Sequence, residues 1–315
     1  MAIAAGANTV IAVKKQTTFG TAATGNFIKF PVRSIALTPT QGFDQQALIG
    51  RGRQPLRAAR DVINVAGTIE VPIDSRYIGH WLTALFGAPA TTGAPSVYTH
   101  VWTTAPVALP AFTIEKQLPD ITTPLYFLYK DVMVDRASIN WEPTGFPFIS
   151  LQCIATSETK STSSGAGTAT TEIYTPFNNL NNFVKKDGTA WEKILQAQIE
   201  YSNALDPVRY VGGAGLIGDI VPGSIGISGT LRSTVADATN YDLGTAATLF
   251  DLQVGWEISA SQKLTFEFEQ VELGRAALPV SGGGRLEITQ DISASYDESE
   301  AKALTVTLIN DQSAY

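Results

Sequence analysis

Apolar and polar residues alternate along most of this 315-residue chain. Alternation with a period of two is typical of strands that bury one face. In the first half, five segments alternate in this way: residues 27–37, 62–73, 111–118, 125–141 and 148–156. In the second half there are six, at residues 193–201, 224–233, 249–259, 263–273, 285–296 and 303–310. Clusters of Gly, Pro, Asn and Asp separate the segments, as turns require. The pattern predicts a mainly β fold.

Two segments have the apolar spacing of a helix instead. Residues 76–86 follow Asp74 and Ser75, which are favourable N-cap residues, and end at Gly87, a residue type favoured just beyond a helix C-terminus. Residues 240–250 form the second predicted helix. Each helix comes directly after a strand that contains a Gly-Thr pair, so strand and helix recur in the same order.

The two Gly-Thr strands share one pattern. Residues 63–70 have the sequence INVAGTIE and residues 225–232 have IGISGTLR, with their glycines 162 positions apart (229 − 67 = 162). Three further pairs of segments correspond in order: 34–40 with 196–202, 112–117 with 264–270, and 148–155 with 303–310 as closing strands. A repeat of this length indicates that a whole module was duplicated.

We therefore predict two tandem modules, residues 1–158 and 177–315, each a β-sandwich or barrel with one flanking helix. The segment between them, 159–176, is rich in Ser, Thr and Gly and is predicted to be a linker or exposed loop. A small sheet leaves unpaired backbone groups at its edges. Two copies in one chain can pair edge to edge, and further chains can continue until a ring closes.

The composition argues against several functional classes. A net charge of −7 argues against a protein that binds nucleic acid by gripping its phosphates. One cysteine and two histidines exclude an intramolecular disulfide and a Cys/His zinc site. No calcium-loop motif is present, so we predict no cofactor and no metal. Cys153 lies on an apolar strand pattern and is predicted to be a core residue.

The N-terminal segment lacks the form of a signal peptide, because the basic pair Lys14–Lys15 follows the mildly apolar run. No window of 18 apolar residues occurs, so we expect no membrane span and a protein that folds in a cytoplasm. Charge is unevenly divided. Residues 1–160 hold 13 basic and 10 acidic side chains, a net of +3, and residues 161–315 hold 9 and 19, a net of −10. Two readings remain open: drift in surface composition, or two surfaces that contact each other.

Several of these segments together resemble the phage tail tube proteins of long-tailed, siphovirus-type phages. The resemblance lies in IAVKKQTTFGTAAT at 11–24, in VAGTIEVPIDSRYIGHWLTALFGAPATTGAPSVYTHVWTT at 65–104 and in LPAFTIEKQ at 109–117. It continues with IEYSNALD at 199–206 and ISGTLRS at 227–233, so it covers nearly the full length. Each motif is short, and their order and spacing carry the resemblance.

The resemblance implies a structural virion protein and no enzymatic activity. Such proteins assemble in the host cytoplasm into rings that stack into the tail tube, through which DNA passes without specific binding. Each ring has an inner β-barrel to which every module contributes sheet. Two-module versions form a trimeric ring with pseudo-sixfold symmetry, and single-module versions form a hexamer. The implied partners are the tape measure protein, the tail terminator and the distal tail proteins.

A long loop between two early strands typically reaches the neighbouring ring in such proteins. In this chain the loop is at 39–61 and carries Arg51, Arg53, Arg57 and Arg60. These arginines either pair with carboxylates of the next ring or form a solvated basic loop. The matching loop at 203–223 has one arginine, Arg209.

Acidic residues on the strands are the candidates for the lumen. Carboxylates repel phosphates and would let DNA slide without sticking. In the segment at 263–273, Glu267 and Glu269 alternate with apolar residues, and Glu115 is the proposed match of Glu267 in the first module. The alternative is that these side chains face outer solvent or a subunit boundary.

Other features favour no catalytic or cofactor site. The G-x-G-x-x-G motif at 213–218 precedes a strand, whereas a dinucleotide site needs a helix there. No G-x-S-x-G motif accompanies His80 or His100. Trp102, Trp141, Trp191 and Trp256 are predicted to fill cores rather than to bind sugar. The remaining alternatives are another ring component of the tail, such as a terminator or baseplate hub, or a secreted β-sandwich that binds glycans.

Overall fold

The computed structural model describes residues 4–50, 52–104, 106, 108–278, 280 and 282–315. The first half contains helix α1 (Tyr77–Phe86), the 3-10 turn η1 (Gly6–Asn8) and strands β1 (Val10–Lys15), β2 (Ile28–Phe30), β3 (Ser34–Ile35), β4 (Thr38–Asp44), β5 (Ala59–Pro72), β6 (Ala90–Ala94), β7 (Val97–Thr103), β8 (Phe112–Leu118), β9 (Leu125–Trp141), β10 (Phe148–Ala155) and β11 (Ser157–Ser161).

The second half contains helix α2 (Thr239–Ala246), the 3-10 turn η2 (Asn179–Asn181) and strands β12 (Asn182–Lys186), β13 (Thr189–Ala190), β14 (Ile194–Ser202), β15 (Asp206–Val208), β16 (Asp219–Val221), β17 (Gly226–Thr234), β18 (Phe250–Ser259), β19 (Gln262–Leu273), β20 (Glu287–Ser295) and β21 (Leu304–Asn310). The fold is mainly β, as the alternation predicts. Pro31 interrupts the strand expected over 27–37, because proline removes a backbone donor, and β2 and β3 lie on either side of it.

The two halves share a pattern of antiparallel strand pairing. In the first half β5 lies between β4 and β10, β10 pairs with β9, and β9 pairs with β8. In the second half β17 lies between β14 and β20, β20 pairs with β19, and β19 pairs with β18. The strand next to the second Gly-Thr strand is therefore β20.

The expected match of 148–155 with 303–310 is wrong, because β10 holds the position that β20 holds in the second half. Cys153 lies opposite Gly67, and Ile292 lies opposite Gly229. The two positions are 139 residues apart (292 − 153 = 139), and the same spacing relates the sequence of β9 to that of β19, Leu125 to Leu264. By this pairing Glu115 does not match Glu267, because Leu128, which lies opposite Glu115, takes that place.

Each Gly-Thr strand passes very close to its neighbour. A Cβ atom at Gly67 would lie 2.1 Å from the carbonyl oxygen of Ala36, and one at Gly229 would lie 2.1 Å from that of Gln198. Real Cβ atoms do not approach a backbone so closely, so glycine is required at both positions. Ala36 and Gln198 hold matching places in the segments 34–40 and 196–202.

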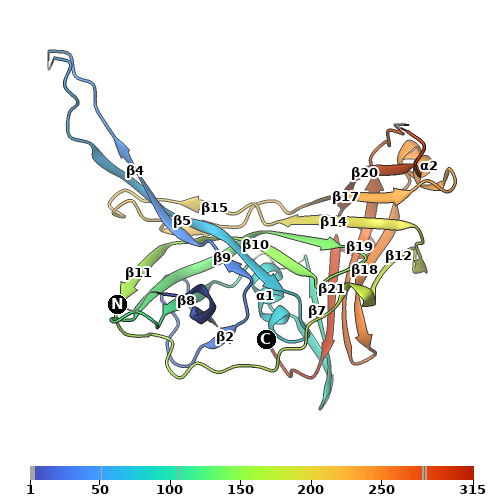
Figure 1. The fold of residues 1–315 in the computed structure, drawn as a ribbon, viewed down its shortest axis with the longest axis horizontal. Helices are drawn as coiled ribbons and strands as arrows, with labels where there is room; N and C mark the ends of the chain where they lie inside the picture. The colour runs from blue at the N-terminus through green and yellow to red at the C-terminus, as the bar shows by residue number, and fades with distance from the viewer. Residues whose placement is uncertain (1–3, 51, 105, 107, 279, 281) are drawn as a thin grey trace.

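The halves are joined into one sheet. Strand β14 of the second half pairs with the C-terminal part of β9, and β21 pairs with β7. Trp141 of β9 stacks on Trp256 of β18 with ring centroids 5.2 Å apart, so the core is continuous across the joint. In Figure 1, β14 crosses between the halves, the β4–β5 hairpin projects from one end, and β20 with α2 lies at the other.

The tryptophans behave largely as predicted. Trp102, Trp141 and Trp256 are buried, and Trp191 is half-buried against Phe250 with ring centroids 5.3 Å apart. Cys153 is fully buried, as predicted, and burial raises the pKa of its thiol to about 12. No helix in the described part of the chain is long and apolar enough to cross a membrane.

The helices differ in how well their ends are predicted. Helix α1 begins and ends within one residue of the expected bounds and is buried along nearly its whole length. Helix α2 ends at Ala246, four residues earlier than expected. Ala247 adopts the left-handed conformation with φ 49°, which stops the helix, and Phe250 begins β18.

The Ser/Thr/Gly-rich segment at 159–176 is attached to the first half along its length. Its first residues belong to β11, which pairs with β9, so this part is a strand rather than a loop. Ala166 is buried and its carbonyl accepts a hydrogen bond from the Phe27 amide at 3.0 Å. The Thr170 amide donates to the Phe27 carbonyl at 2.9 Å.

Candidate assembly surfaces

The β4–β5 hairpin forms an arm, which we define as residues 38–61. All seven residues of β4 are exposed, among them Phe43 at 74%. Ile49, near the tip of the arm, is also exposed. Figure 1 shows the arm extending well beyond the rest of the molecule. An exposed two-stranded hairpin with bulky apolar side chains is typical of a surface that contacts a partner.

The predicted arginines lie on this arm. Arg53, Arg57 and Arg60 are exposed, and none of the three forms an ion pair with a described residue. Arg51 lies outside the described residues. Arg60 is opposite Phe43 in the β4–β5 pairing, so the hairpin brings a guanidinium and an exposed ring to the same part of the arm.

The corresponding loop of the second half is folded back on the molecule. Its strands β15 and β16 pair with each other, and Leu205, Ile217 and Ile220 pack on Ala111 and Met133 of the first half. The Ile63 amide donates to the carbonyl of Gly215 at 3.0 Å, and the Arg209 guanidinium donates to Asn64. The two long loops therefore differ: one is a free arm and the other covers the first half.

The three predicted lumen acids have different surroundings. Glu115 is 1% exposed, and its carboxylate accepts hydrogen bonds from Ser164 Oγ at 2.6 Å, Gly165 N at 2.6 Å and Gln117 Nε2 at 2.7 Å. It holds the segment that follows β11 against β8.

Glu269 is also buried, and it accepts a hydrogen bond from Thr305 Oγ1 at 2.9 Å and lies 3.3 Å from Lys302 Nζ. Glu267 is half-buried and is bonded to Gln253 Nε2 at 2.5 Å. Glu267 and Glu269 lie on one face of β19, while Glu115 belongs to the other half. Glu267 is the most exposed of the three in the subunit.

A polar cluster around the start of α1 is not predicted by the sequence beyond its N-cap. The carboxylate of Asp74 accepts hydrogen bonds from the amides of Arg76, Tyr77 and Ile78 at 3.1, 3.2 and 3.0 Å. Burial raises the pKa of Asp74 to about 6, although these amide donors favour its charged form. Arg76 occupies the N-cap position of α1, and the carboxylate of Asp74, two residues earlier, accepts from the amides at the start of the helix.

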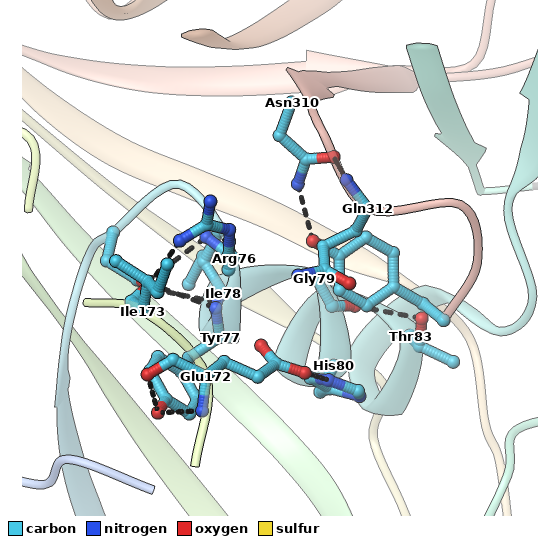
Figure 2. Close-up of polar contacts among 12 residues, drawn as sticks. Arg76, Tyr77, Ile78, Gly79, His80, Thr83, Glu172, Ile173, Asn310 and Gln312 are labelled. Carbon is cyan, nitrogen blue, oxygen red and sulfur yellow. Dashed lines mark hydrogen bonds and ion pairs between the residues drawn. The ribbon is translucent and has the colours of Figure 1, made fainter. Parts of the chain in front are cut away.

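The same cluster fixes distant parts of the chain to α1. The Arg76 guanidinium donates to both carboxylate oxygens of Asp311, at 2.8 and 2.5 Å, and to the Ile173 carbonyl at 2.9 Å. Glu172 accepts from Tyr77 through its carbonyl and lies 3.2 Å from His80. Figure 2 shows Glu172 and Ile173 facing the first turns of α1.

The C-terminus is part of this cluster. A Cβ at Gly79 would lie 2.2 Å from the Tyr315 ring, so glycine leaves the space that the ring occupies. His100 Nε2 lies 3.0 Å from the Gln312 carbonyl, and burial lowers the pKa of His100. Both histidines therefore have structural partners. The described residues hold no group of three or more His, Cys, Asp or Glu side chains placed to share a metal ion.

A comparison with protein families decides the identity. A family model described as phage tail tube protein matches residues 6–296, which include both Gly-Thr strands, both helices and the arm. The chain belongs to the phage tail tube protein family. A search of curated proteins found no match. As a phage tail tube protein it is a structural component of the virion tail, and self-assembly into a tube is its role. The resemblance of the sequence to phage tail tube proteins is confirmed.

Proposed function

We propose that three copies of this tail tube protein close into a ring with pseudo-sixfold symmetry. The proposal treats residues 1–158 and 177–315 as duplicated modules joined by the segment 159–176. Its main support is the edge-to-edge pairing of β9 with β14, because this joint connects two halves with the same strand order. A joint that links such halves within a chain can recur between chains until the ring closes.

Stacked rings then form the tube of a siphovirus-type tail, through which DNA passes during ejection. Assembly takes place in the cytoplasm of the host bacterium, and the tape measure, tail terminator and distal tail proteins are the partners. No enzymatic activity is part of this role. Trp102, Trp141 and Trp256 are buried and cannot stack on a sugar, and the half-buried Trp191 packs against Phe250, so the tryptophans give little support to the alternative of glycan binding.

The arm is the proposed contact between rings. It projects from the subunit, it carries exposed apolar side chains, and its described arginines have no acidic partner within the subunit. The acidic second half, with its net charge of −10, supplies carboxylates in the neighbouring ring. The folded-back loop at 203–223 cannot reach as far, so each chain contributes one arm.

For the lumen we propose carboxylates that repel the DNA backbone. Glu267 is the first candidate, because it is only half-buried, whereas Glu115 and Glu269 are buried inside the subunit. In a structure of the assembled ring we expect Glu267 to face the bore. A position on the outer surface would contradict the proposal.

Charge reversal on the arm tests tube growth. The variant Arg53→Glu/Arg57→Glu/Arg60→Glu should remain folded, because all three side chains are exposed and unpaired. It should form few or no tubes by negative-stain electron microscopy, because the reversed charges repel an acidic neighbour. The matched control Arg53→Lys/Arg57→Lys/Arg60→Lys keeps the charge and should form tubes. Tubes of normal length from the glutamate variant would contradict the proposed contact between rings.

A further inference from the structure

The joint between the halves has a defined register. Ala197 of β14 lies opposite Trp141 of β9, and the pairing continues residue by residue to Ser202 opposite Arg136. Ile199 lies opposite Ile139, and both side chains are buried. Glu200 lies 3.5 Å from Arg136 across the joint. The end of β9 thus occupies the edge of the Gly-Thr sheet of the second half.

Each partner in this joint has a counterpart in the other half. Residues 35–40 correspond to 197–202, because Leu37 is beside Gly67 as Ile199 is beside Gly229. Residues 275–280 correspond to 136–141 by the spacing of 139 positions (275 − 136 = 139). The sequences agree as well, since Arg275 and Ala276 repeat Arg136 and Ala137.

Both counterparts lack the partner that the joint would give them. Strands β3 and β4 pair with β5 on one side, and no described strand pairs with their other edge. Residues 274–278 follow β19 and belong to no strand in the described part of the chain. Leu278 is 41% exposed, whereas its counterpart Ile139 is 5% exposed. An apolar side chain is therefore in solvent where the other half buries one.

The two open edges lie on different sides of the molecule. Figure 1 shows β4 on the left and β20, which pairs with β19 directly before residues 274–278, on the right. A single chain cannot join them, so a second copy is the occupant that fits both. Such a head-to-tail contact repeats from chain to chain and closes into a ring when the rotation allows it.

We propose that residues 275–278 of one copy form an antiparallel strand beside residues 37–40 of the next copy. By the register of β9 and β14, Leu278 lies opposite Leu37, Ala277 opposite Thr38, and Arg275 opposite Thr40. Assembly orders residues 275–278 into a strand and buries Leu278. The inference rests on the proposed ring and specifies its contact.

Disulfide trapping tests the register. In Thr38→Cys/Ala277→Cys both new thiols replace exposed side chains, and directly opposite residues in an antiparallel pair have Cα atoms at a separation that a disulfide can bridge. Cys153 stays out of the reaction because its thiol is buried. Rings treated with oxidised glutathione should lose the monomer band on a non-reducing gel and give covalent dimers and trimers.

Two controls sharpen the result. Pro39→Cys/Ala277→Cys shifts one residue so that the side chain leaves from the opposite face, and it should stay monomeric on the gel. Ser138→Cys/Glu200→Cys occupies the corresponding positions of the existing joint and should form a disulfide within each chain. Equal cross-linking of the shifted pair, or rings without any cross-link, would overturn the inference and leave the proposed ring standing. Absence of rings in the unsubstituted protein would contradict the proposed function and this contact with it.

Discussion

Asp74 combines two opposing effects at one residue. Its carboxylate caps three amides of α1, which stabilises the helix, and it is fully buried, which disfavours its charge. The neighbouring Arg76 pairs with Asp311 instead, and among the described residues no cation forms an ion pair with Asp74. The carboxylate of Asp74 is therefore a hydrogen-bond acceptor for the start of α1 although its charged form is disfavoured by burial.

Asparagine at this position should separate the two effects. Asp74→Asn keeps an acceptor oxygen and removes the buried charge, so at pH 7 it should be at least as stable as the natural protein. Asp74→Ala leaves buried amides without an acceptor and should lower the free energy of unfolding by about 1–2 kcal/mol. Denaturant unfolding of the three proteins measures both effects. An alanine variant as stable as the asparagine variant would contradict the capping role.

The same residue predicts a pH dependence. The folded-state pKa of about 6 lies above the ordinary value of 3.8, so the folded state retains its proton to higher pH than the unfolded state. The contribution of Asp74 to stability is therefore full below about pH 4 and falls as the pH rises through about 6, by about 3 kcal/mol. The difference in unfolding free energy between Asp74→Asn and the natural protein should grow over this range. A constant difference would contradict the raised pKa.

At the scale of elements, the Gly-Thr strands are the clearest shared feature of the two halves. Gly67 and Gly229 allow the same close approach of a neighbouring backbone. A methyl group at either position forces the strands apart, whereas Gly283 has no neighbouring atom within 4 Å. The three glycines therefore provide a matched comparison.

Alanine substitution should reproduce this difference. Gly67→Ala and Gly229→Ala should each lower the free energy of unfolding by about 1–3 kcal/mol, because the new Cβ overpacks against backbone. Gly283→Ala should change it by no more than about 0.5 kcal/mol. Thermal or denaturant unfolding of the single variants tests this. A neutral Gly229→Ala beside a damaging Gly67→Ala would show that the two strands are packed differently.

Alternation predicts the strands well where one face is buried, as in β9 and β19. It does not predict the paired part of the arm, because all residues of β4 are exposed and no apolar alternation is present. The early end of α2 depends on Ala247 in a left-handed conformation, which few sequence signals indicate for alanine.

The alternation of apolar residues also does not specify which distant strands pair with each other. The match of 148–155 with 303–310 relied on similar apolar patterns, and the register with the Gly-Thr strands assigns that place to β20. Among the candidate site residues, the exposed arginines follow from the sequence. The burial of Glu115 and Glu269 does not, because it depends on the segment at 164–165 and on Lys302.

At the scale of the whole molecule, the subunit has two open edges and one arm. The first half has a net charge of +3 and the second −10. Head-to-tail contacts would place unlike halves beside each other around the ring, and the Arg136–Glu200 pair across the internal joint follows the same order of charge. Around such a ring the arm at 38–61 and the folded-back loop at 203–223 would also alternate. The six modules would then be similar in fold, while the contacts made by arm and loop would repeat only three times.

The number of chains in a ring distinguishes the proposed trimer from a hexamer. Native mass spectrometry of isolated rings should give three chains of 33.6 kDa each, because every chain supplies two of the six modules. Six chains per ring would contradict the account, since each chain would then occupy one place rather than two.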